Sequence, residues 1–315
     1  MNFMKNSVNV MQKELFYQLK SKRLVILLLT IVGIILLHLF GLYNSVISNY
    51  HLYLQTEQMY IENGLDIIES LKETNYVVTE GNTSITSNPL KEDFVNLAIS
   101  IQNLDGTSIV SNSLEYFIFV FGTLIFGIYA AYVATYDYKF HTHKFFSSQY
   151  KQNELLTGKL LSIFLVLFSS LLLLGTIAYC ASPILKWLVR KTVPTEKYAL
   201  PGLSYENHLW IQILFTVALL GFYILISYTV AYILKNMIPI TIFLLLYTLL
   251  IPVLGKYDVK NICSFFAQKI FSFKARFVVF QATDISPACG ASVIVLMLLV
   301  AGIALFFTSK RSAYN

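Results

Sequence analysis

The chain has few charged residues. Only 13% of its 315 residues are Asp, Glu, Lys or Arg, about half of the roughly 25% that is typical of a soluble domain. Hydrophobic residues make up 56% of the chain, and they gather in long uninterrupted runs. This composition excludes a disordered chain, a coiled coil and an ordinary soluble enzyme, and it indicates an all-α polytopic membrane protein.

Motifs for catalysis and nucleotide binding are missing from the sequence. It contains neither H-E-x-x-H nor G-x-S-x-G. Gly158-Lys159 matches the end of a P-loop, but Leu160 replaces the Ser or Thr, and Asn153 stands where the first Gly belongs. His141-x-His143 has no nearby Cys or carboxylate partner, so we interpret both histidines as structural or interfacial. We expect no catalytic, cofactor or metal site in this chain.

Cysteine is also scarce. Cys180, Cys263 and Cys289 are three in number and lie near the predicted outer boundary of the membrane. A disulfide between Cys263 and Cys289 is sterically conceivable. We expect three free thiols.

Six apolar runs are predicted to span the membrane, since a helix needs about 20 apolar residues to cross a hydrocarbon core of ~30 Å. The fifth run has 17 residues, with Pro239 and Pro252 near its ends. His38 is the one strongly ionisable residue away from a run's end, and Glu115 only borders the second run. We expect no Asp or Glu inside a span. The runs cover residues 24–43, 116–135, 159–180, 209–234, 238–254 and 287–308.

Two of the segments between the spans have patterns of their own. Segment 44–115 holds ten acids and two lysines, and we expect a small helical outer domain there. It should contain a helix over 51–73, a link or hairpin over 79–88, and a helix from about Pro89 to Asn103. Beyond the outer loop 181–208, segment 255–286 predicts an amphipathic or re-entrant element. Its apolar stripe comprises Ile262, Phe266, Ile270, Phe273 and Phe277.

The first 23 residues predict an amphipathic interfacial helix, an elbow before the first span. Its apolar stripe is Met4, Val8, Met11, Leu15 and Leu19. The lysines on other faces would meet anionic headgroups. A merely soluble leader helix is the alternative. The apolar core that follows is too long for a signal peptide, and no small-residue cleavage site follows it, so we expect it to be retained.

Lysine and arginine predict the orientation. If 1–23, 136–158 with Lys159 at its edge, 235–237 and 309–315 are cytoplasmic, these pieces hold 12 basic and 3 acidic residues. The outer pieces hold the other 11 basic and 14 acidic residues. The positive-inside rule then places both termini in the cytoplasm and the chain in the cell membrane as a multi-pass protein.

The loop 136–158 resembles that of the permeases of the type-2 ATP-binding cassette export family. That loop runs roughly E-x-x-x-G-T, a hydrophobic patch, P-x-S-R, then G/S-K. Here Asp137 stands for the acid, Thr142 for the threonine and Lys151 for the arginine, and Gly158-Lys159 matches directly. His141 replaces the glycine and Ser148 the proline. Lys13-Glu14-Leu15 in the leader is similar to the family's elbow helix.

The resemblance implies a mechanism and partners. Two permease chains, identical or different, would pair in the lipid bilayer, and each would present a coupling helix at about 139–149 to an ATPase subunit that binds ATP and Mg. Aromatic anchors beside basic residues suit such an interface, although a helix resting on the membrane surface is the alternative. The expected contact residues are Asp137, Lys139, Phe140, His141, Thr142, His143, Lys144, Phe145, Phe146, Ser147, Ser148 and Lys151.

The composition of the spans suggests the cargo. They are rich in Phe, Tyr and Leu with scattered Ser and Thr, which suits outward export of a hydrophobic or amphipathic substrate such as a peptide or antibiotic, a lipid or a drug. We expect no nucleic-acid partner. The alternatives are an ATPase-free membrane sensor or immunity protein, and an intramembrane enzyme.

Overall fold

The chain folds as a bundle of long helices in the computed structural model, which describes residues 2–73, 77–80, 83–140, 142–198, 208–273 and 282–312. Five helical stretches in this described part are long and apolar enough to cross a membrane. The predicted all-α membrane fold is confirmed at this level. The five stretches are α2 (Arg23–Glu62), the continuous rod Gly106–Lys139, α8 (Gln152–Arg190), α9 (Leu209–Leu234) and Pro287–Thr308 of α12 (Pro287–Ser312).

The rod Gly106–Lys139 has three parts. It consists of α5 (Gly106–Tyr116), the π-helix η1 (Phe117–Gly122) and α6 (Thr123–Lys139). The π-helix interrupts the regular helical hydrogen bonding in the middle of the rod, a feature that is frequent at functional sites.

The predicted span 238–254 forms a shorter helix. Its apolar helical part is Ile238–Leu250, made of α10 (Ile238–Leu245) and the π-helix η3 (Leu246–Leu250). It ends because Ile251 is extended, with ψ 125°, as expected for a residue that precedes a proline. At 1.5 Å per residue this helix is about 20 Å long, shorter than the ~30 Å hydrocarbon core. A sixth crossing therefore stays a prediction.

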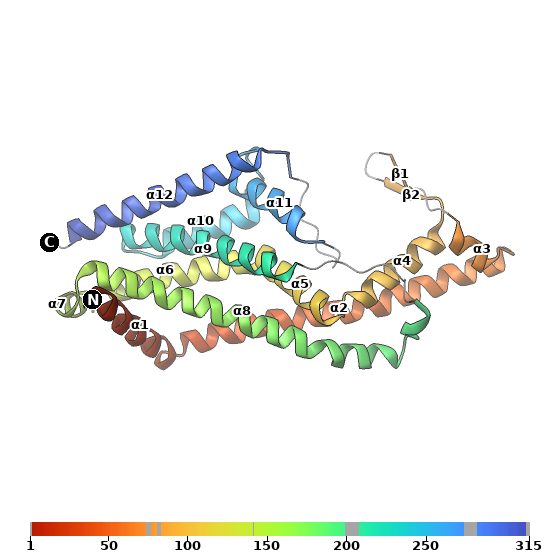
Figure 1. The fold of residues 1–315 in the computed structure, drawn as a ribbon, viewed down its shortest axis with the longest axis horizontal. Coiled ribbons are helices and arrows are strands. Elements are labelled where there is room, and N and C mark those ends of the chain that lie inside the picture. The colour runs from red at the N-terminus through yellow and green to blue at the C-terminus, as the bar shows by residue number, and fades with distance from the viewer. Residues whose placement is uncertain are drawn as a thin grey trace.

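Two helices extend far beyond the apolar runs that predicted them. α2 has 40 residues and α8 has 39, which corresponds to about 60 Å each. In Figure 1 both continue past the rest of the bundle at the end opposite to the chain termini. Part of the predicted outer domain 44–115 and part of the loop 181–208 are therefore extensions of spanning helices.

The outer arm is stabilised by α4 (Pro89–Gln102), which runs beside the distal half of α2 (Figure 1). Tyr53 of α2, Phe94 of α4 and Tyr198 of the 3-10 helix η2 (Thr195–Tyr198) form an aromatic cluster with centroids 5.3–5.9 Å apart. Thr56 Oγ1 donates a hydrogen bond of 2.6 Å to Asp93 Oδ2.

Local signals in this arm predicted its structure well. Asn88 caps α4, its side chain accepting from Lys91 N, and Pro89 occupies the first turn. The expected hairpin is present as β1 (Val77–Glu80) paired antiparallel with β2 (Thr83–Thr86). The helix expected over 51–73 is broken near Gly64, which has φ 71°, and it resumes as α3 (Ile67–Lys72).

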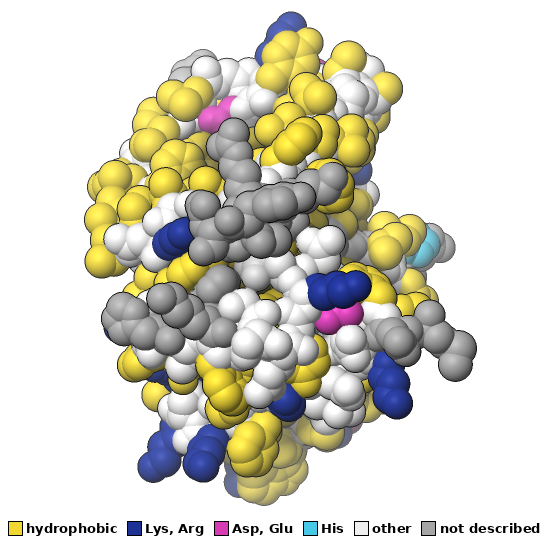
Figure 2. Space-filling model, turned by 90° about the vertical axis from the view of Figure 1, so that its left-hand side faces the viewer, with side chains coloured by type: hydrophobic (Ala, Val, Ile, Leu, Met, Phe, Trp, Pro, Cys, Tyr) yellow, Lys and Arg dark blue, Asp and Glu magenta, His cyan; other side chains and the backbone are white. Residues whose placement is uncertain are grey.

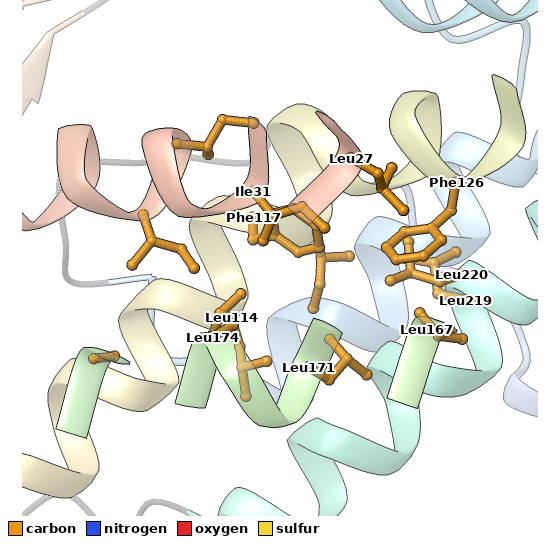
Figure 3. Close-up of a cluster of buried hydrophobic side chains, with 14 of the residues drawn as sticks. Leu27, Ile31, Leu114, Phe117, Phe126, Leu167, Leu171, Leu174, Leu219 and Leu220 are labelled. Carbon is orange, nitrogen blue, oxygen red and sulfur yellow. The ribbon is translucent and has the colours of Figure 1, made fainter. Parts of the chain in front are cut away.

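The core lies between α2, the rod, α8 and α9. Figure 3 shows how their apolar side chains meet, with Ile31 of α2, Phe117 of η1 and Leu220 of α9 among those that are fully buried. In the amphipathic segment 255–286, α11 (Val259–Ile270) packs beside α9 and α12. Phe273 follows the end of this helix, and Phe277 lies outside the described residues. Cys180, Cys263 and Cys289 are free thiols.

Candidate functional site

The predicted loop 136–158 lies at the end of the bundle where both termini lie (Figure 1). It contains α7 (His143–Gln149), a short helix between the end of α6 and the start of α8. Thr142, directly before α7, is fastened to α6 twice. Its N–H donates to Asp137 O at 3.0 Å, and its hydroxyl donates to Asp137 Oδ1 at 3.2 Å. The acid and the threonine of the family pattern therefore contact each other.

Asp137 also pairs with the lysine at the other end of the loop. Lys159 Nζ lies 2.6 Å from Asp137 Oδ2 and donates a 3.1 Å hydrogen bond to Val133 O. Both side chains of the ion pair are buried. Because the two residues belong to α6 and α8, their ion pair ties together the two long helices that flank α7.

Gly158 allows α1 (Asn2–Lys20) to approach α8 closely. A Cβ at this position would lie 2.6 Å from the Cβ of Val10 and 2.7 Å from the backbone oxygen of Ser7. Real Cβ atoms do not tolerate such distances, so any larger residue would push α1 away. In the Gly158-Lys159 pair the glycine therefore allows α1 to pack closely on α8, while the lysine binds α6 through its ion pair with Asp137.

The face of α1 that is buried against the bundle is polar. It carries Ser7, Glu14 and Gln18 beside Val10, and all four are less than a tenth exposed. Gln18 Nε2 donates to Glu14 Oε1 at 3.1 Å, and the hydroxyl of Tyr129 on α6 donates to Gln18 Oε1. Burial raises the pKa of Glu14 above its usual range, although the nearby Lys159 acts in the opposite direction.

The apolar stripe predicted for α1 does not coincide with the face that is buried against the bundle. Met4, Val8 and Leu19 are exposed, while Met11 and Leu15 are half-buried and Lys13 is exposed. The helix itself is present as predicted, but the groups that it buries are mostly polar. The predicted stripe therefore did not identify Glu14 as a residue of the buried face. The physical reason is that α6 offers polar partners to this face.

The three phenylalanines of the loop have different surroundings. Phe145 is 61% exposed. Phe146 packs edge-on against Tyr17 of α1, with ring centroids 6.0 Å apart. Phe140 is 47% exposed and lies near Arg23 and Tyr136. Only Phe145 therefore belongs to α7 and presents most of its ring outward.

Some of the remaining predicted contact residues are exposed, and others lie outside the described part of the chain. Lys139, Ser147, Ser148 and Lys151 are exposed, and Ser148 Oγ donates to Phe145 O at 2.7 Å within α7. His141 and the side chains of His143 and Lys144 lie outside what the structure describes. The exposed residues among the described contact residues are thus partly basic, whereas Asp137 is buried and does not offer its side chain to a partner.

A small pocket lies between α1, α7 and α8. Its volume of about 10 Å³ is enough for roughly one water molecule. Lys13 covers one side of it, with Nζ 4.9 Å from the ring centroid of Tyr150. The pocket is too small for a substrate. Its lining includes Glu14, Tyr17, Asp137, Phe146, Tyr150 and Lys159.

The surface of this end is positively charged. The three acids in the predicted cytoplasmic segments, Glu14, Asp137 and Glu154, are all buried. Figure 2 views this end, where Lys and Arg side chains are spread over the surface and Asp and Glu are few. The surface is positive because the side chains of the acids point into the protein while those of the lysines point outward. The exposed lysines are Lys5, Lys13, Lys20, Lys22, Lys139, Lys151 and Lys235.

One carboxyl lies deeper in the bundle than the sequence predicted. Glu115 belongs to the candidate span Gly106–Lys139 and is 0% exposed. The helix begins ten residues before the apolar run, and this is why hydropathy placed Glu115 at a border. Because this candidate span has 34 residues, about 51 Å at 1.5 Å per residue, the helix is longer than the ~30 Å hydrocarbon core. That no acid lies inside the membrane therefore stays a prediction.

Within the described ranges no three His, Cys, Asp or Glu side chains lie close enough together to hold a metal ion. Comparison with known proteins finds no protein-family model, no curated protein and no solved structure that matches this chain.

Proposed function

We propose that this chain is the membrane-spanning permease subunit of an ATP-driven exporter of the type-2 ATP-binding cassette export family. A separate ATPase, with ATP and Mg bound to it, would supply the energy. The cargo would be a hydrophobic or amphipathic molecule: a peptide or antibiotic, a lipid or a drug. The observation that carries the proposal is α7, a short helix held between two candidate spans with Phe145 exposed on it.

The contacts of α7 suit a part that transmits force. Asp137 binds the residue before α7 and also Lys159, two turns into α8. Phe146 holds α7 to α1 through Tyr17. A push on α7 would therefore reach α6, α8 and α1 together, whereas a loop without these contacts would absorb it. Phe145, which faces outward, would be the anchor in the ATPase.

The positive surface supports the proposed orientation. Cytoplasmic segments of membrane proteins carry an excess of lysine and arginine. Here the segments at the end that bears α7 expose seven lysines, while their acids Glu14, Asp137 and Glu154 are buried. In this proposal both termini and α7 are cytoplasmic, and α3, α4 and the hairpin are outside. Residues 238–254 would make the sixth crossing, and 255–286 would lie at the outer boundary.

The exposed side of α1 suits the elbow role. Met4, Phe16 and Leu19 are each at least half exposed, and such side chains are stable in the interfacial region of a bilayer. α1 would then lie with its polar face on the protein and its apolar side chains toward lipid. A second permease chain would complete the transport path.

The test is co-purification with an ATPase. The neighbouring reading frames are searched for a P-loop ATPase, which is co-expressed with this chain, and the complex is isolated through a tag on the permease. Phe145→Ala should lose the ATPase, because truncating an interface anchor costs about 2 kcal/mol or more, that is, more than tenfold in affinity. The matched control is Phe40→Ala. Phe40 is 62% exposed, about the same as Phe145, but lies within α2.

The control variant should keep the ATPase. The assignment of α7 is wrong if Phe145→Ala retains its partner together with normal ATP hydrolysis. The proposed function itself is wrong if no P-loop ATPase co-purifies with the wild-type chain.

A further inference from the structure

A second polar cluster lies inside the bundle, away from α7. Glu115 is 0% exposed, and among the described residues its Oε1 atom has no hydrogen-bond partner. Its other oxygen accepts one bond, from Phe273 N at 3.2 Å, near the long end of the range for such bonds. An ionisable group buried in a spanning segment is costly and usually has a function.

Gln212 of α9 is arranged in the same way. It is 2% exposed and its Oε1 atom has no partner in the described part of the chain. Its Nε2 atom donates to Ile270 O at 3.2 Å. Glu115 and Gln212 thus hold the same short segment, 270–273, from two different helices, and each leaves one acceptor oxygen unused.

The segment between them is aromatic. Phe271 packs edge-on against Phe119 of η1 and Phe215 of α9, with centroids 5.9 and 6.1 Å away. Phe273 lies 5.5 Å from Phe119, and its φ of 48° is costly for a residue with a bulky side chain. The segment is therefore held by ring packing and two long hydrogen bonds rather than by a relaxed backbone.

The backbone of the rod is also unusual at this point. The π-helix η1 begins at Phe117, two residues after Glu115. Such interruptions occur often at functional sites because they change the direction of the side chains near them. This observation is independent of the unpaired oxygens and points to the same place.

We propose that Glu115 and Gln212 bind the cationic group of an otherwise apolar substrate, with the rings of Phe119, Phe271 and Phe273 around it. This assignment rests on the proposed export function and names its substrate class, a lipophilic cation. The carboxylate supplies charge, the amide oxygen a second acceptor, and the ring faces attract cations. A bound cation replaces the N–H of Phe273 on Glu115, and the segment moves aside.

The donor set favours an organic cation over a metal ion. Ca²⁺ takes about six to eight oxygen ligands, whereas two unused acceptor oxygens are found here. Aromatic surroundings add no ligands for such an ion, but they bury the apolar part of an organic cation well.

The test is direct binding to the purified chain, without an ATPase. Equilibrium dialysis with radiolabelled tetraphenylphosphonium in detergent should show saturable binding that unlabelled probe displaces and that uncharged triphenylphosphine oxide does not. Glu115→Gln should weaken binding at least about tenfold, as expected when one partner of a buried charge pair is lost. Glu69→Gln, an exposed acid on α3, should bind like wild type.

A second variant guards against a folding defect in Glu115→Gln. Phe119→Leu keeps the charge and removes one ring face, and it should weaken binding by about threefold to tenfold. Absence of saturable binding to the wild-type chain overturns the proposal, as does wild-type affinity in both variants. Because no ATPase takes part, a failure here is distinct from a failure of the coupling experiment.

Discussion

Lys159 Nζ lies 2.6 Å from Asp137 Oδ2, and this buried ion pair closes the loop that carries α7. Removing one partner of a buried pair leaves an uncompensated charge, at a cost of about 3–5 kcal/mol. We expect Asp137→Asn to lower the thermal unfolding temperature of the detergent-purified chain markedly. Asp137→Leu combined with Lys159→Met should recover most of the loss, since no charge then stays buried.

The control is the ion pair between Lys186 and Asp105. These side chains are 39% and 49% exposed, and exposed pairs contribute about 0–1 kcal/mol. Asp105→Asn should therefore shift the unfolding temperature little. Equal shifts for Asp137→Asn and Asp105→Asn would show that the loop is not held by its ion pair.

A second prediction concerns Gly158. Gly158→Ala should loosen α1 from α8 because its Cβ would lie 2.6 Å from that of Val10. The control is Gly33→Ala on α2, where a Cβ meets nothing within 4 Å. There the substitution should be neutral or stabilise by about 0.5–1 kcal/mol through helix propensity. Limited proteolysis of residues 2–20, together with the unfolding temperature, measures both effects, and the prediction fails if the two variants behave alike.

Short-range signals predicted the local structure. Asn88 and Pro89 determine where α4 begins, because a cap and a first-turn proline act within a few residues. Hydropathy located the apolar runs because it depends only on the residues within each run. It did not predict the lengths of α2 and α8, since polar residues such as Thr56 continue a helix when a neighbouring helix covers them.

Long-range partners were beyond the reach of the sequence. The periodicity of α1 identified its apolar stripe but not the face that meets the bundle, because that choice depends on Tyr129, more than 100 positions away. The sequence did contain a signal for the buried face. Ser7, Glu14 and Gln18 recur at helical spacing and therefore lie on one face of α1. The loop resemblance singled out Asp137, Thr142 and Lys159 separately, and the structure shows that Asp137 contacts both of the others.

The raised pKa of Glu14 predicts a dependence of stability on pH. The folded state binds the proton more tightly than the unfolded state, whose value is near 4.5. Stability from this group is therefore greatest below about pH 4.5 and falls as pH rises through the folded pKa. Glu14→Gln should raise the unfolding temperature at neutral pH, and the difference from wild type should shrink as pH falls toward 4.5. Glu69→Gln, on the exposed surface of α3, should show no such trend.

The proposed orientation predicts which residues a membrane-impermeant thiol reagent reaches in intact cells. All three native cysteines are first replaced, and single cysteines are introduced at exposed positions at opposite ends of the bundle. Glu69→Cys on α3 should react, because it would lie outside. Ser148→Cys on α7 should react only after the cells are permeabilised, because the lysine-rich end would face the cytoplasm. Labelling of position 148 in intact cells, with position 69 protected, would reverse the orientation and separate α7 from any cytoplasmic ATPase.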